Sequence, residues 1–68
     1  MTQCDRIIDY VKEFGSITAL EAMRDLGIMR LAARISDLEA RGIHFVHAQE
    51  TAKNRYDQKV SYTRYKFV

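Results

Sequence analysis

Three arginines, Arg30, Arg34 and Arg41, lie in residues 29–41, a stretch with neither glycine nor proline. Such a stretch predicts a helix, and at about 100° per residue the arginines follow one flank of it. A guanidinium presents paired N–H donors, which match O6 and N7 of guanine or two oxygens of a phosphate. The neighbouring face carries mostly small or apolar side chains, which favours close approach to a partner: Met29, Ala33, Ser36, Asp37 and Ala40.

The arginines also have an intramolecular alternative. Either Arg30 or Arg34 could form an ion pair with a carboxylate of the preceding helical segment, Glu21 or Asp25. For Arg30, near the start of the helix, we favour contact with a base edge. For Arg34, which lies nearer the apolar stripe of the helix, neither alternative is preferred.

Two other residues of this face bear on recognition. Ala33 is small enough to let the backbone approach a base or a thymine methyl group. Asp37 is unfavourable beside phosphates, but its carboxylate could accept a hydrogen bond from cytosine N4 or orient an arginine. Both are candidate contact residues, together with Met29.

A second cationic group, Lys53, Asn54 and Arg55 followed by Tyr56, lies near the end of the chain. Residues 51–58 lose the alternation of the segments around them and predict an exposed loop. The last eighteen residues hold five basic groups and one acidic group, a net of +4, whereas the first 28 hold three and five, a net of −2. Cationic side chains in such a loop bind phosphates with little sequence preference. The alternative is a solvated turn that protects a strand edge.

Two helices are predicted before residue 29. Thr2 and Asp5 form a capping pair, and Gly15 ends a helix whose apolar residues recur at helical spacing: Cys4, Ile7, Ile8, Val11 and Phe14. A bridging strand, 16–18, then places Ile17 in the core. Thr18 and Glu21 repeat the capping signature for a second helix, 19–26, which Gly27 ends and which buries Ala22, Met23 and Leu26.

The helix over 29–41 needs a core behind it. Its apolar stripe is Leu31, Ile35 and Leu38, and Gly42 follows the helix. After Gly42 the apolar period changes from 3.6 to 2, which predicts a hairpin with six to eight residues in each arm. We expect one core in which these side chains pack together: Leu31, Ile35, Leu38, Ile7, Val11 and Phe67.

This order of elements resembles the winged helix-turn-helix domain. The residues that carry the resemblance are 18–22, then Leu26-Gly27-Ile28, then Leu31, Ile35, Leu38, Gly42 and Ile43. It covers nearly the whole chain, and the small size also resembles helix-turn-helix proteins of bacteriophages and prophages. The resemblance implies an α+β fold in a single domain, 1–68: a three-helix bundle followed by a C-terminal two-stranded hairpin, the wing.

The resemblance also implies how the chain would act. The helix at about 29–41 would enter the DNA major groove, and the wing at about 51–58 would lie on the backbone or in the minor groove. The chain departs from the family pattern in the turn. Family members often have a longer loop between the turn glycine and the first buried residue of the third helix, whereas here only Ile28, Met29 and Arg30 separate Gly27 from Leu31. A turn this tight changes the crossing of the two helices and therefore which residues reach base edges.

The sequence thus predicts a protein that binds duplex DNA, as a transcriptional regulator or a phage architectural factor. The candidate contact residues are Met29, Arg30, Ala33, Arg34, Asp37, Lys53, Asn54 and Arg55. A second copy of the chain is a further expected partner, because one module contacts few base pairs. The alternative function is a protein-interaction module on the same scaffold, for example a phage inhibitor of a host protein.

Other classes of function find little support. Cys4 is the single cysteine, so neither an intramolecular disulfide nor a thiolate zinc site is expected. His44 and His47 are three apart on a predicted strand and face opposite ways. The sequence shows no catalytic triad order and no glycine-rich phosphate loop, so we expect neither an enzyme nor a cofactor. No apolar run approaches the length of a membrane span, which predicts a soluble cytoplasmic protein.

Overall fold

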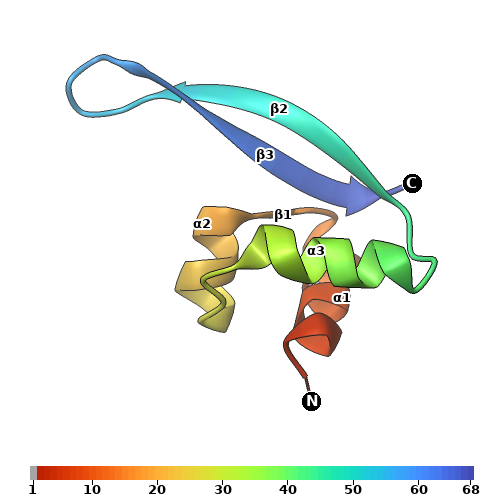
Figure 1. Cartoon of the computed structure of the whole chain (residues 1–68). Helices are drawn as coiled ribbons and strands as arrows, with labels where there is room; N and C mark the ends of the chain where they lie inside the picture. Colours follow the sequence, from red (N-terminus) through yellow and green to blue (C-terminus); the bar gives the residue numbers. More distant parts are fainter. Residues whose placement is uncertain (1) are drawn as a thin grey trace.

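The computed structural model describes residues 2–68 and shows helical segments beneath a long hairpin (Figure 1). In chain order the elements are α1 (Gln3–Phe14), β1 (Ile17–Thr18), α2 (Ala19–Glu21), a π-helical turn η1 (Ala22–Leu26), α3 (Leu31–Ala40), β2 (Phe45–Lys53) and β3 (Lys59–Phe67). The three antiparallel strands run in the order β1-β3-β2. The predicted α+β winged-helix architecture is confirmed, with the bridging strand as a third member of the sheet.

Helix α1 has the predicted ends. The Thr2 hydroxyl accepts a hydrogen bond from the Asp5 backbone N–H at 3.2 Å, and the Asp5 carboxylate accepts one from the Thr2 backbone N–H at 3.1 Å. The hydrogen bond from the Thr2 backbone, followed by that with its side chain, lowers the pKa of Asp5. Gly15 adopts a φ of 88°, the left-handed conformation that ends the helix. Phe14 does not belong to the core, because 62% of it is exposed. It lies in the last turn, where its ring contacts Tyr10 at a centroid distance of 4.6 Å.

The second helix begins as predicted but changes its period. Thr18 and Glu21 form a capping box, and Gly27 ends the helix with a φ of 70°. Between them, Ala22–Leu26 form a π-helical turn, which holds more residues than an α-helical turn. Ala22 is fully buried, whereas the prediction of a buried Met23 was wrong: it is 44% exposed. The wider turn carries Met23 out of the stripe that a 3.6-residue period would bury.

The core lies where α1, β1, the helix-turn-helix and the base of the hairpin meet. Its largest fully buried side chains are Ile7, Val11, Ile17, Ile28, Leu31, Ile35 and Leu38. Phe67 is half-buried and packs against this cluster, and its ring lies 5.3 Å from that of Phe45. The predicted packing of the α3 stripe against α1 and the last strand is therefore confirmed.

The hairpin is longer than expected. Its register runs without a bulge from Phe45 opposite Phe67 to Lys53 opposite Lys59, nine residues in each arm. The prediction of a loop over 51–58 was wrong for 51–53, which belong to β2, and the connecting loop is 54–58. Every residue from 51 to 61 is exposed. The outer hairpin therefore has no buried face, which is why the alternation that signals a strand is weak there.

Candidate nucleic-acid interface

The start of α3 differs from the prediction. The helix spans Leu31–Ala40, shorter than 29–41 at both ends, so Met29 and Arg30 belong to the turn that precedes it. Arg30 is the N-cap residue, with φ −119° and ψ 59°, and its side chain makes no capping hydrogen bond. The first amides of α3 therefore lack a side-chain acceptor, and the positive end of the helix dipole is left for an external anion.

A hollow of about 250 Å³ lies beside this helix start. It is lined by Gln3, Gly27, Met29, Arg30 and Arg34. Met29 is 74% exposed, so its apolar side chain is open to contact with a partner. Gln3 comes from the first turn of α1 and was not predicted, because its place in the sequence says nothing about its distance from Arg30. The hollow thus joins two arginines and an amide side chain beside the uncapped start of α3.

The two arginines of the hollow differ in their partners. Arg34 Nε lies 3.3 Å from Asp37 Oδ2, one turn further along α3. This contact is an ion pair without hydrogen-bond geometry, because the buried Nε has no hydrogen-bond partner. Glu21 and Asp25, the partners considered from the sequence, bind other arginines. Arg30 is exposed, and within residues 2–68 it has no carboxylate at ion-pair distance.

The hairpin tip is organised by Asn54. Its Oδ1 accepts the backbone N–H of Tyr56 at 2.9 Å and that of Gln58 at 3.1 Å. Lys53 Nζ lies 3.2 Å from Asp57 Oδ1 across the loop. Arg55 is exposed, and the ion pairs of the described chain do not include it. Of the three predicted tip residues, Asn54 therefore shapes the loop, Lys53 is partly neutralised and Arg55 is the free cation.

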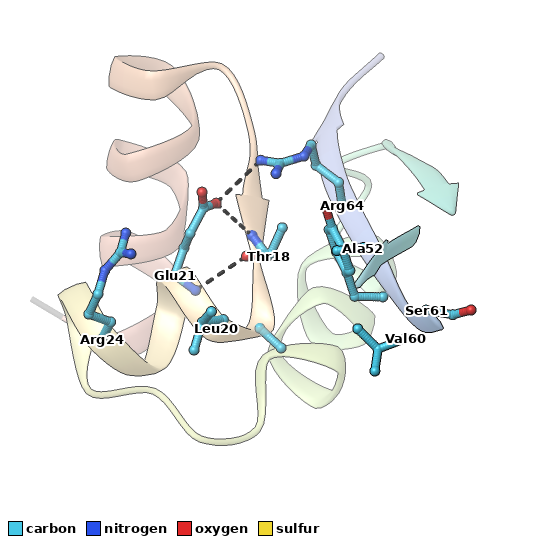
Figure 2. A pocket seen from close by; sticks show the side chains of 10 residues that line it. Thr18, Leu20, Glu21, Arg24, Ala52, Val60, Ser61 and Arg64 are labelled. Atoms are coloured by element: carbon cyan, nitrogen blue, oxygen red, sulfur yellow. Dashed lines mark hydrogen bonds and ion pairs between the residues drawn. The ribbon is translucent and has the colours of Figure 1, made fainter. Parts of the chain in front are cut away.

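Arg64 ties the hairpin to the helices. Its Nε donates to Glu50 Oε1 on β2 at 2.9 Å, and its Nη1 lies 3.0 Å from Ser16 Oγ and 3.4 Å from Glu21 Oε1. The same Glu21 oxygen accepts the Thr18 amide, so the capping box of α2 is part of the tie (Figure 2). The hydrogen bond between Arg64 and Glu50 raises the pKa of Arg64 and lowers the pKa of Glu50.

Two more polar contacts fix the elements around α3. His47 Nε2 on β2 lies 3.1 Å from Glu39 Oε2, which joins the hairpin to α3. Asp25 Oδ2 accepts the Tyr10 hydroxyl at 2.6 Å, and its carboxylate also accepts the Arg24 guanidinium. The hydrogen bonds from Arg24 and then Tyr10 lower the pKa of Asp25 to about 2. The contacts His47–Glu39 and Tyr10–Asp25 each join two separate elements, so sequence spacing gives no signal for them.

A family model described as the winged helix-turn-helix domain matches residues 2–68. The chain belongs to this family. Membership supports DNA binding in general and agrees with an exposed, basic start of α3. No curated protein and no solved structure matches the chain significantly. In the described part of the winged helix-turn-helix chain, no helix is long and apolar enough to cross a bilayer.

Proposed function

We propose that this domain binds duplex DNA with α3 in the major groove and the hairpin tip on the neighbouring backbone. The observation that carries the proposal is Arg30, an exposed guanidinium without a carboxylate partner among residues 2–68, at the uncapped start of α3. A free guanidinium beside a helix N-terminus attracts phosphate and can also reach a guanine edge. The chain would act as a transcriptional regulator or a phage architectural factor.

The roles of the candidate residues then differ. Arg30 reads a base or binds the nearest phosphate, with Met29 and Ala33 offering an apolar surface beside it. Arg34 contacts DNA through its remaining guanidinium nitrogens, while its Nε stays in the ion pair with Asp37. At the tip, Arg55 binds phosphate, and Lys53 has to leave Asp57 before it can do the same. Asn54 supports binding through the shape of the loop.

A salt series tests this proposal. Binding to a non-specific duplex should weaken linearly with the logarithm of salt concentration, because each neutralised phosphate releases condensed counterions. The slope should fall by about 0.9 for each contact removed, so Arg30→Ala should lower it by about that amount. Arg41→Ala is the matched control, since it removes an equal charge at the opposite end of α3 and should leave the slope unchanged. Binding that is absent or insensitive to salt would overturn the proposal.

A further inference from the structure

Strand β3 has an open edge next to α2. The two residues of β1 pair only with Tyr65 and Arg64, so β3 has no neighbour on that side from there to the tip. The hydrogen bonds Val68 N to His44 O and Asn54 N to Gln58 O show that even-numbered residues bond across the hairpin. Because the register is unbroken, odd-numbered residues of β3 direct their N–H and C=O groups away from β2. Tyr65 and Thr63 flank the pairing with β1, so the open part of the edge is Lys59 and Ser61.

A groove of about 390 Å³ lies between α2 and the hairpin beside this edge, and its lining reaches across β3 to Ala52 of β2. Leu20 of α2 forms one wall and Val60 of β3 the other, and Figure 2 shows both side chains at its mouth. They are 63% and 43% exposed, respectively. The polar groups at the inner end, Glu21 and Arg64, bond to each other. The groove therefore offers apolar walls beside a row of unpaired backbone donors and acceptors.

We propose that this groove binds an extended peptide segment of a partner protein, which adds to β3 as a strand in line with β1. Lys59 and Ser61 would supply the main-chain hydrogen bonds, and an apolar side chain of the peptide would enter between Leu20 and Val60. Strand addition of this kind takes affinity from the backbone and specificity from side-chain pockets. The groove shares no lining residue with the hollow at Arg30, so it extends the proposed function to a second ligand.

Charge defines the peptide further. Glu21, the one carboxylate among the lining residues, is bonded to Arg64, which also binds Glu50. Lys59 at the open edge is exposed, and no ion pair of the described chain includes it. An acidic residue beside the apolar anchor of the peptide would therefore be favoured.

Two other occupants fit less well. A DNA backbone offers only acceptors along its phosphates, so the carbonyl groups of Lys59 and Ser61 would find no donor and the apolar walls would have no partner. A second copy of the chain would bring its own basic hairpin to the edge, so the exposed Lys53 and Lys59 of both copies would lie close together and repel each other. Both occupants are outcomes that the experiment distinguishes.

The test starts from a displayed library of short random peptides with the whole chain as bait. Enriched sequences should alternate apolar and polar positions and carry acidic residues beside one apolar anchor. Leu20→Glu should weaken their binding more than about tenfold, because it places a carboxylate against the apolar anchor. Met23→Glu is the matched control, as Met23 is exposed on the same helix but does not line the groove.

The bound state is then read by NMR. An enriched peptide should slow amide hydrogen exchange at Lys59 and Ser61, and the same peptide N-methylated at alternate residues should not. Leu20→Glu should leave DNA affinity unchanged. A loss of peptide binding can therefore be distinguished from a loss of DNA binding. The inference is overturned if no peptide is enriched, if Leu20→Glu binds the peptides equally, or if these amides keep their exchange rates. Protection of the same amides by duplex DNA alone, or a dimer that Leu20→Glu disrupts, would also overturn it.

Discussion

The helical half of the molecule and the outer half of its hairpin are held in different ways. Residues 4–45 include every buried side chain of the described chain, whereas residues 51–61 are all exposed. Helix α3 is placed by hydrophobic burial, through Leu31, Ile35 and Leu38. The hairpin is placed by cross-strand pairing and by a few polar ties centred on Arg64.

This difference bears on recognition. A base contact needs a side chain held at a fixed distance and angle, which a packed helix start can provide. A phosphate contact tolerates small displacements, because it depends on charge more than on geometry. On the proposed function, the packed α3 would hold the backbone beside Arg30 for reading sequence, and the exposed hairpin would bring Arg55 to phosphates. The predictions below separate the two regions, from the largest expected effect to the smallest.

The first prediction is a large loss of stability in the helical half. Ile35 is 1% exposed in the core, so Ile35→Ala should lower the free energy of unfolding by about 2–5 kcal/mol. Val60→Ala is the hairpin control: Val60 is 43% exposed, and the change should stay within about 0.5 kcal/mol. Urea melts measure both. Equal midpoints for Ile35→Ala and the parent would mean that α3 does not face the core.

The second prediction concerns the tie between the two regions. Arg64→Met removes three polar contacts, and it should lower the free energy of unfolding by about 1–3 kcal/mol, toward the lower end because solvent reaches the group. Lys66→Met on the same face of β3 is the control. If Arg64 positions the wing for DNA, Arg55→Ala should weaken binding less in the Arg64→Met background than in the parent. If Arg55→Ala weakens binding equally in both backgrounds, Arg64 contributes to stability and does not position the wing for DNA.

The third prediction is an acid-sensitive contribution from the helical half. The pKa of Asp25 falls from 3.8 to about 2 on folding, so between these values the unfolded chain binds more protons. The stabilisation is therefore complete well above pH 3.8 and is lost as the pH falls toward 2. Thermal melts from pH 6 to pH 2 should show that the parent has a higher melting temperature than Asp25→Asn near pH 6, and that this difference disappears in acid. A difference in melting temperature that does not depend on pH would contradict this linkage. Asp9→Asn, on the exposed face of α1, is the control.

The smallest expected effects are at the hairpin tip. Arg55→Ala should lower the salt slope of DNA binding by about 0.9, because the free cation neutralises one phosphate. Lys53→Ala should have a smaller effect, since Lys53 first has to leave Asp57. Both variants should weaken binding to all duplexes alike. If the double variant keeps the affinity and slope of the parent, the tip is a solvated turn.

Much of the fold could be predicted from local chemistry. The capping boxes at Thr2 and Thr18, the left-handed glycines and the α3 stripe all act within a few residues of sequence. The π-helical turn was not predictable from apolar spacing, and it exposed Met23. The hairpin arms were underestimated because a strand exposed on both faces, such as 51–53, has no apolar alternation.

The candidate site was predictable only in part. The sequence singled out Arg30 and Arg55, whose side chains extend into solvent and depend little on distant neighbours. It could not show that Asn54 holds the tip loop or that Gln3 lines the hollow at α3. The ties of Arg64 reach 48 residues back to Ser16 and 43 back to Glu21, a distance over which no spacing rule applies.

The most direct test of base reading at α3 compares Arg30→Ala with Arg30→Lys on a duplex selected by the purified protein and on a scrambled duplex. Arg30→Ala should weaken binding to the selected duplex by about 1–3 kcal/mol and to the scrambled duplex far less. Arg30→Lys should restore the charge but not the planar pair of donors, so binding to the selected duplex should stay weak. If alanine weakens both duplexes equally and lysine restores both, Arg30 only contacts the backbone, and the claim that the start of α3 reads sequence is wrong.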